Sequence, residues 1–415
     1  MIIRYSGHKL ETTRPLVILE KPYPPATRGT VIVWGLMATL PVGGMVWQVF
    51  HYLVPLRRLG FDVWYVEDSD RPLYDMTRFE PTLQAPAENI ELVRRFMADI
   101  GLGDRWAFRL PGKKTVIGAT DADGLKRLYA EAVAAINLCG AQDLDERHFG
   151  ISNRIYMQTD PVGMQVQVAH GDPLCIDTLK KHQWHFTYGA KLGDPDCRIP
   201  VNGIVDWHKT LPPVCLDFWG YANGPAKDGK LSTVLNWKHD DRDVEWQGEI
   251  WHWSKDREFR RFLDLPARAA LPLEMCLGGA DDKDIAEITA HGWSIKPSTD
   301  CMDPALYRDY IMGSLGEFSA AKELVVVSRS GWVSDRTVCY LAAGRPAIVQ
   351  DTGIGSFLPL GEGLFTFNSS DAALAAIEAV KSDYARHSRA AREIAREHFD
   401  GEHVMGDVMR TVGLL

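Results

Sequence analysis

Ser334, Asp335 and Arg336 place a hydroxyl group, a carboxylate and a guanidinium group side by side at the predicted start of a helix. They follow an apolar run at 325–327, and the helical run that they open ends at Gly344. A helix N-terminus binds anions, because free backbone N–H groups and the positive end of the helix dipole meet there. Ser334 is a good N-cap, Arg336 can bind a phosphate through two hydrogen bonds, and Asp335 can accept hydrogen bonds from a sugar hydroxyl. The three residues therefore favour a nucleotide diphosphate as ligand, with a simply capped helix as the plainer alternative.

Further candidates for contacts to such a ligand stand at the ends of predicted strands. Gly43 and Gly44 follow the first strand, where glycine lets backbone N–H groups approach a phosphate closely. Lys238 follows the first strand of the second half and faces the expected cleft, and Trp293 and Ile295 end a strand that would pack on a nucleotide base. The plainer alternatives are a tight turn for the glycines, a surface position for the lysine and burial in the core for Trp293.

Charged residues just before the loop at 328–333 add to this group. Glu317, Lys322 and Arg329 lie upstream of Ser334. Sugar selection depends on a few hydrogen bonds in a cleft, and Glu317, Asp335 and Asp351 are candidates for them.

Two residues of the first half are candidates for the base that removes a proton from an acceptor hydroxyl group. Asp160 ends an apolar stretch and precedes Pro161, so it can take a proton or simply turn the chain. His185 lies in a loop-rich segment, where a histidine can act as a base, contact the ligand or be a structural residue. His182 and His185 lack a third ligand for zinc, and the DxD pairs of this acidic chain are compositional noise, so we predict no metal site.

Composition and charge limit the class of protein. A chain of 415 residues, with 46% hydrophobic and 24% charged residues, predicts two domains of a soluble globular protein. A net charge of -9 gives no broad basic surface for nucleic acid, although a local basic patch is not excluded. Seven scattered cysteines fit reduced thiols in the cytoplasm. The apolar stretch at 31–50 is interrupted by glycine and proline, so we expect no membrane span.

Alternating strand and helix patterns position the candidate residues. A strand at 30–37, a glycine loop, a helix at 46–59 and a strand at 62–67 form a βαβ unit, which implies a parallel sheet. Residues 170–228 have no convincing period and read as loop. A second α/β series starts at 231, and it includes the elements that surround the loop at 328–333. These are a predicted strand at 324–328, a helix at 334–343 and a strand at 346–350.

These patterns divide the chain into four segments. Prolines prevent regular structure through much of an N-terminal extension at 1–29. Two α/β domains follow at 30–228 and 229–385, joined by a linker that is rich in small residues. Helices at 386–415 end the chain and can cross back to the first domain. Ligands of such open sheets bind beyond the carboxyl ends of the strands, so we expect the site in the cleft between the two sheets.

Two stretches resemble those of GT-B glycosyltransferases. The pattern G-W-x-S followed by L-A-A-G-R-P, at 331–346, is similar to the donor-site signature of that superfamily, and GLMATLPVGGMVWQVFHYLVPLRRLGFDVWYVED, at 35–68, looks like its first βαβ unit. VSDR, WHFTYGA and QTDP are similar to stretches of uncharacterised bacterial family 1-like members. The resemblance covers roughly residues 30 to 415. Retaining members often carry two glutamates that would fall at Gly331 and Cys339 here, so the stereochemical course stays open.

The resemblance implies an α/β protein of GT-B fold, with two Rossmann-like domains facing each other across a cleft. The first domain would bind the acceptor and supply the base, and the second would bind the nucleotide sugar. The donor-binding residues would be Gly43, Gly44, Lys238, Trp293, Ile295, Glu317, Lys322, Ser330, Gly331, Trp332, Ser334, Asp335 and Arg336. Asp160 and His185 would be catalytic.

The expected function is transfer of a sugar from an NDP-sugar, a UDP-sugar among the options, to a hydroxyl acceptor in the cytoplasm. The resemblance implies that neither a metal nor a cofactor is needed, since the NDP-sugar is a co-substrate. The acceptor would be a small molecule, a glycan or a modified DNA base. Three alternatives stay open: an NDP-sugar 2-epimerase of the same fold, a glycosyltransferase that modifies DNA bases, and a non-catalytic protein that binds nucleotide sugars.

Overall fold

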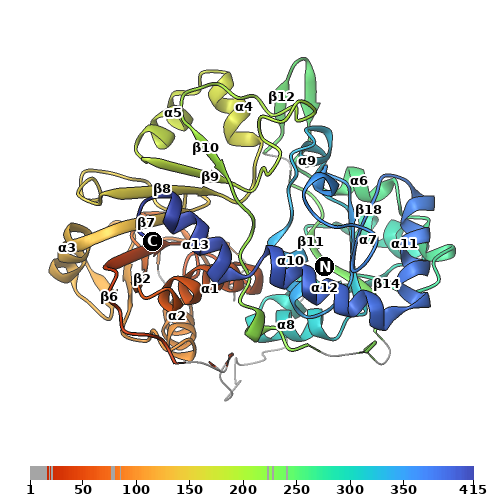
Figure 1. Cartoon of the computed structure of the whole chain (residues 1–415), viewed down its shortest axis with the longest axis horizontal. Coiled ribbons are helices and arrows are strands. Elements are labelled where there is room, and N and C mark those ends of the chain that lie inside the picture. Colours follow the sequence, from red (N-terminus) through yellow and green to blue (C-terminus); the bar gives the residue numbers. More distant parts are fainter. Residues whose placement is uncertain are drawn as a thin grey trace.

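The computed structural model of the chain describes residues 16, 17, 19, 22–75, 80–84, 86–221, 224–226, 229–239 and 242–415. Residues 1–15 of the predicted extension and part of the predicted linker lie outside this set. The described backbone contains two large, mainly parallel β-sheets that lie side by side and are covered by helices (Figure 1). We call the part around the first sheet the first half and the part around the other sheet the second half. Every described helix is too short or too polar to cross a membrane.

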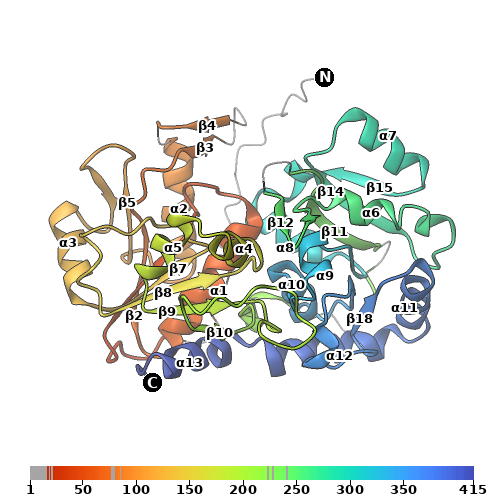
Figure 2. The same ribbon diagram turned by 90° about the horizontal axis from the view of Figure 1, so that it is seen from above.

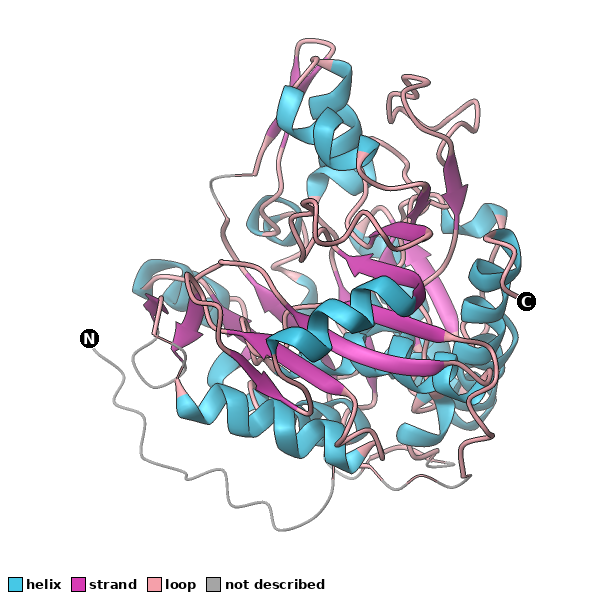
Figure 3. Ribbon diagram, turned by 90° about the vertical axis from the view of Figure 1, so that its left-hand side faces the viewer, coloured by secondary structure: helices cyan, strands magenta, loops and turns pink. Residues whose placement is uncertain are grey.

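Eight strands form the sheet of the first half, in the spatial order β10-β9-β8-β7-β1-β2-β5-β6. Their bounds are β1 Thr30–Trp34, β2 Asp62–Glu67, β5 Trp106–Arg109, β6 Val116–Gly118, β7 Ala132–Leu138, β8 Asn153–Gln158, β9 Trp184–Thr187 and β10 Trp207–Lys209. Neighbours pair in parallel except β5 and β6. The central strand β1 is almost wholly buried, since helices pack on the sheet (Figure 3).

Six parallel strands form the sheet of the second half, in the order β15-β14-β11-β16-β17-β18. Their bounds are β11 Leu231–Asn236, β14 Leu273–Gly278, β15 Ser294–Pro297, β16 Gly316–Ser319, β17 Ala347–Gln350 and β18 Leu364–Phe367. The carboxyl ends of β11, β16 and β17 meet at one edge of the sheet, because the strands run in parallel. Side chains that follow these strands therefore lie close to one another.

Helices connect the strands. Their bounds are given for the first half and then for the second half. In the first half they are α1 Gly43–Arg58, α2 Ala87–Asp99, α3 Ala122–Glu131, α4 Gly163–Ala169 and α5 Pro173–Lys180. In the second half they are α6 Asp256–Arg260, α7 Asp282–Ala290, α8 Pro304–Met312, α9 Glu323–Val327, α10 Asp335–Ala342, α11 Ser370–Ser382 and α12 Tyr384–His398. The last helix of the chain is α13 Gly401–Thr411, and a small hairpin, β3 Leu73–Asp75 with β4 Glu80–Thr82, stands apart from the large sheet.

The last helix, α13, lies against α1 of the first half, although α12 before it belongs to the second half (Figure 2). The backbone of Val214 accepts a hydrogen bond from Gly401 N (2.9 Å) and donates one to Phe399 O (2.8 Å). Gly401 is required at this point, because a Cβ there would stand 2.5 Å from Pro55 Cγ. The chain thus passes between the halves a second time at its end.

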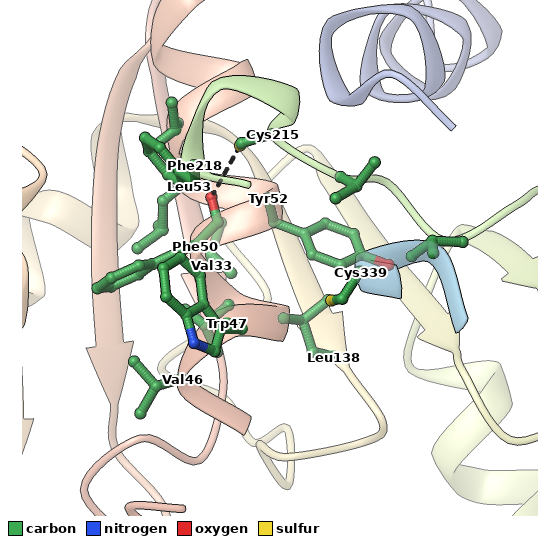
Figure 4. Close-up of a cluster of buried hydrophobic side chains, with 14 of the residues drawn as sticks. Val33, Val46, Trp47, Phe50, Tyr52, Leu53, Leu138, Cys215, Phe218 and Cys339 are labelled. Carbon is green, nitrogen blue, oxygen red and sulfur yellow. Dashed lines mark hydrogen bonds between the residues drawn. The ribbon is translucent and has the colours of Figure 1, made fainter. Parts of the chain in front are cut away.

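A buried cluster holds the two halves together around α1 (Figure 4). Trp47, Phe50 and Tyr52 of α1 belong to it, and so does Cys339 of α10 in the second half. Trp47 Nε1 also donates a hydrogen bond to the carbonyl oxygen of Pro304, at the start of α8 (2.8 Å). Helix α1 is therefore covered on both sides, which explains why nearly all of its residues are buried.

A hairpin of the second half, β12 Val244–Trp246 with β13 Glu249–Trp251, reaches α4 of the first half (Figure 1). His170 Nε2 donates to the carbonyl oxygen of Glu245 (2.8 Å), and Arg198 pairs with Glu249 (2.8 Å). Apolar side chains from both halves form one buried cluster with the hairpin. Its members include Val162, Val166, Leu192, Ile199, Val244, Trp251, Ala321, Leu324 and Val325.

Two predictions about local structure are wrong. The strand predicted at 324–328 is the short helix α9, and the buried strand that precedes the loop is β16. A four-residue apolar run fits either element, because a single helical turn and a buried strand share the same composition. The segment at 170–228, predicted as loop, contains α5, β9 and β10. Its strands are only three or four residues long, so no alternation could be seen.

Candidate functional site

A cavity of about 300 Å³ lies between the halves at the carboxyl edge of the second sheet. Its lining residues are Asp160, Val234, Leu235, Asn236, His239, Arg242, Trp253, Ser254, Lys255, Lys322 and Arg336. Asp160 follows β8 of the first half, and the others belong to the second half. The lining is rich in cations, so the cavity suits an anionic ligand.

Arg336 is fixed at the base of this cavity by three hydrogen bonds. Its Nε pairs with Glu317 Oε1 (2.7 Å), and its two terminal nitrogens donate to Val234 O (2.8 Å) and Ser319 Oγ (2.7 Å). Glu317 is 0% exposed, and its second oxygen has no hydrogen-bond partner. The guanidinium group is thereby held at the ends of β11 and β16, where the sequence placed a phosphate contact.

Lys322 lies where three groups converge. Its Nζ pairs with Asp160 Oδ1 at 2.5 Å and stands 3.5 Å from the ring centroid of Trp253. The ring of Trp332 lies 5.7 Å from the same nitrogen. The side chain of Lys322 is 13% exposed, whereas that of Asp160 is 41% exposed. The ammonium group is thus enclosed by aromatic rings, and the carboxylate is open to the cavity.

Lys255 is one of several lining residues that the sequence did not reveal. It stands at the N-cap position of α6 and is 9% exposed. Among the described residues, no hydrogen bond or ion pair to its Nζ is found. Burial holds the pKa of Lys255 well below its usual value, and the nearby charges of Arg336 and Lys322 lower it further. A buried amine that lines a cavity and has no anionic partner is a group to which an anion can bind.

Asp335 faces the first half and does not line this cavity. Gln48 Nε2 donates to its Oδ2 (3.0 Å), and the hydroxyl group of Tyr188 lies 3.5 Å from its Oδ1. Burial raises the pKa of Asp335 to about 7, and the charge of Asp160 adds to this effect. The Asp335 carboxyl group, which was predicted to bind a sugar hydroxyl, therefore contacts side chains of the first half. Ser334 caps α10, as its sequence position predicts, by accepting from Arg336 N (3.3 Å).

The first turn of α10 leaves little room for a phosphate. A hollow of only about 20 Å³ lies next to it, lined by residues that include Ser334, Arg336 and Thr337. That volume holds about one water molecule. The cavity of about 300 Å³, which Arg336 also lines, is the larger of the two spaces.

The segment from Ser330 to Trp332 joins the halves. Trp332 Nε1 donates to Thr159 O (2.8 Å), and the carbonyl oxygen of Ser330 accepts from Lys191 N (3.1 Å). Gly331 has a φ of 70°, and a Cβ there would stand 2.7 Å from the Lys191 side chain. The G-W part of the motif thus requires glycine for close contact with a loop of the first half.

Other predicted site residues are engaged elsewhere. A Cβ on Gly43 would stand 2.6 Å from Tyr307 Cβ of α8, so this glycine allows the halves to pack, and Gly44 faces the same tyrosine ring. Lys238 pairs with Asp284 (2.7 Å) and is not among the residues that line the cavity. The structure thus shows a packing contact for Gly43, and its phosphate contact stays a prediction.

His185, Trp293 and Ile295 are not brought to the cavity. His185 is buried and hydrogen-bonded through Nε2 to the carbonyl oxygen of Leu179 (2.8 Å), and burial lowers its pKa. Trp293 is buried and donates through Nε1 to Leu263 O (3.0 Å). Ile295 is partly buried on β15. The surroundings of His185 and Trp293 are those of a structural histidine and a core tryptophan, which are the plainer alternatives.

No group of three or more metal-ligating side chains gathers anywhere in the part of the chain that the structure describes. Metal independence stays a prediction, because nothing in the geometry tests it.

No protein-family model matches the sequence, and neither does any curated protein. Solved structures do match. An α-glucosyltransferase in complex with UDP superposes with a TM-score of 0.54 at 10% identity, over 92% of this chain and 99% of that chain. Anabaena Alr3699/HepE in complex with UDP-glucose gives a TM-score of 0.54 at 10% identity, over 93% of this chain and 100% of that chain.

The chain has the GT-B fold. The matches extend over nearly the whole length of each chain, so they include both sheets. An α-glucosyltransferase was also solved with UDP and a 13-mer DNA containing a HMU base, at a TM-score of 0.54 and 10% identity, over 92% of this chain and 99% of that chain. At such identities the likeness concerns the fold, and the predicted fold class is confirmed.

Proposed function

We propose that this chain is a glycosyltransferase that transfers a sugar from a nucleotide diphosphate sugar to a hydroxyl acceptor. The observation that carries the proposal is the convergence of Arg336, Lys322 and Lys255 on one cavity between two Rossmann-like halves. Proteins of the same fold were solved with UDP and with UDP-glucose, which supports a uridine diphosphate sugar as donor.

The charges in the cavity match a diphosphate. Glu317 balances Arg336 and Asp160 balances Lys322, at distances of 2.7 and 2.5 Å. Lys255 has no anionic partner at hydrogen-bond distance among the described residues. A diphosphate would give this amine its partner and would offer further oxygens to Arg336 and Lys322.

The same groups suit the chemistry of transfer. The acceptor hydroxyl oxygen forms a bond to the anomeric carbon as the bond from that carbon to the diphosphate breaks. Negative charge then develops on the leaving phosphate oxygen, where Arg336, Lys322 and Lys255 are placed to stabilise it. Asp160 is the carboxylate of the first half that lines the cavity, and it is exposed enough to take the hydroxyl proton.

The first half does not favour DNA as the acceptor. Three arginines near the carboxyl edge of its sheet, Arg71, Arg109 and Arg147, are paired with carboxylates. Those partners are Asp68, Asp70, Asp143 and Asp145. Neutralised arginines add little attraction for a phosphate backbone. A small molecule or a glycan is therefore the acceptor class that we propose.

Thermal shift with UDP, GDP, dTDP, ADP and CMP tests the donor site. One diphosphate should stabilise the wild type, and Arg336→Ala should abolish that shift. Lys230→Ala is a matched control, because Lys230 forms a comparable ion pair with Glu274 (2.6 Å) at the opposite edge of the same sheet. No shift with any nucleotide at millimolar concentration would refute the proposal. Product analysis without an acceptor then separates a transferase from an epimerase, which would release an isomer of the NDP-sugar.

A further inference from the structure

The ion pair between Asp160 and Lys322 uses two groups that the proposed reaction needs for different purposes. Lys322 lines the proposed diphosphate site, and Asp160 is the proposed base. Their side chains are 2.5 Å apart, so each neutralises the other in the free protein. A carboxylate bound to an ammonium group is a poor proton acceptor, and a paired ammonium group is a weaker phosphate ligand.

The surroundings of the pair decide which partner moves when an anion arrives. Lys322 is enclosed between Trp253 (3.5 Å) and Trp332 (5.7 Å), and only 13% of its side chain is exposed. Trp332 is itself fixed by its hydrogen bond to Thr159 O (2.8 Å). Asp160 has no such enclosure, since 41% of its side chain is exposed. The carboxylate is therefore the partner that can leave.

We propose that the donor diphosphate displaces Asp160 from Lys322 and thereby releases the base for the acceptor. This inference rests on the proposed function. Two phosphates carry more charge than one carboxylate, and Lys255 and Arg336 hold the diphosphate at the same time, so the exchange is favourable once the donor is bound. Asp160 then takes the proton of the acceptor hydroxyl as the new glycosidic bond forms and the diphosphate leaves. When the diphosphate departs, Asp160 releases this proton to solvent, and its carboxylate pairs with Lys322 again.

The exchange predicts that the base competes with the donor for Lys322. Removal of the carboxylate charge should therefore strengthen donor binding while it weakens transfer. We expect Asp160→Asn to bind the diphosphate that stabilises the wild type about fivefold more tightly, because an anion that competes for one lysine and repels phosphate is gone. Transfer from the NDP-sugar should fall by about 10²- to 10⁴-fold, as for loss of a general base.

Isothermal titration with the nucleoside diphosphate alone measures the first effect, and product formation at saturating NDP-sugar measures the second. Asp194→Asn is the matched control, since Asp194 pairs with Lys209 at 2.6 Å outside the cavity lining and should change neither value. If Asp160→Asn does not fold, Asp160→Ser removes the same charge and is measured in its place.

Unchanged or weaker diphosphate binding by the Asp160 variant would overturn the exchange, because a pair with a purely structural role would not tighten binding when broken. That result leaves the proposed function intact if the wild type binds and transfers. Absence of diphosphate binding by the wild type would instead overturn the proposed function and the exchange together. The two failures are therefore distinguishable in one experiment.

Discussion

Lys255 is the residue through which the site proposal can be tested most sharply, because binding and stability should respond to its replacement in opposite directions. In the free protein it is 9% exposed and has no anionic partner at hydrogen-bond distance among the described residues. A buried ammonium group without a partner costs stability, and burial lowers its pKa. Methionine has a similar length and no charge. Lys255→Met should therefore raise the free energy of unfolding by about 1–2 kcal/mol.

The same replacement should weaken the diphosphate complex. A charge-assisted hydrogen bond contributes about 1.5–3 kcal/mol, which corresponds to an affinity loss of about 10- to 100-fold. Urea unfolding measures the first change and isothermal titration the second. Lys230→Met is the matched control, because Lys230 is about one-third exposed and already paired with Glu274. It should give no gain in stability and no loss of affinity.

The pH dependence follows from the lowered pKa of Lys255. The amine must gain a proton when the anion binds, so diphosphate affinity should fall as pH rises above the lowered pKa. Titration in buffers of different ionisation enthalpy should show proton uptake on binding in the wild type and less in Lys255→Met. For stability, the unfolded chain binds more protons at this lysine than the folded chain, so its contribution improves as pH rises towards the unfolded value. A Lys255→Met variant that is less stable and binds diphosphate normally would refute this reasoning.

Three further outcomes follow from single residues. Arg336→Lys should retain the charge but lose two of three fixed contacts, and it should weaken diphosphate binding about tenfold or more in titration. Gly43→Ala should lower the melting temperature by several degrees, since its Cβ would stand 2.6 Å from Tyr307 Cβ, and an unchanged temperature would show that α8 can shift freely. Asp335 keeps its proton up to about pH 7 in the folded chain and loses it near pH 4 in the unfolded chain. The free energy of unfolding should therefore fall as pH rises from about 4 to about 7. Asp335→Asn should flatten that slope in urea titrations at several pH values, and an unaltered slope would assign it to other groups.

The sequence predicted the elements whose pattern is local. A strand that is buried on both faces, a glycine loop and an apolar helix identify β1 and α1 without reference to the rest of the chain. Ser334 and Arg336 were found for the same reason, since a hydroxyl N-cap and an arginine in the first turn are neighbours in sequence. Lys322 was found because it lies just before the same loop.

Contacts between distant segments could not be predicted. Lys255 becomes a cavity residue because the segment after the hairpin β12–β13 returns to the end of β11, where Lys255 N donates to Trp237 O (3.2 Å). The hairpin that precedes it has strands of only three residues. Asp335 finds Gln48 and Tyr188 in the other half, and a sequence pattern does not show which half a side chain will face. The packing of Gly43 against Tyr307 could not be predicted either, because Tyr307 lies far along the chain.

The hairpin β12–β13 also restricts how the two halves can move. Enzymes that close around a ligand often turn about a single hinge. Here the chain passes between the halves near Val214 and Gly401. The hairpin attaches the second half to α4 at another place, through a buried apolar cluster and the bond from His170 to Glu245. The buried cluster around α1 and the bond from Trp332 to Thr159 attach the halves at further places. Rotation of one half about a single point would therefore break at least one of these contacts, and opening the cavity on the hairpin side requires the cluster with α4 to separate.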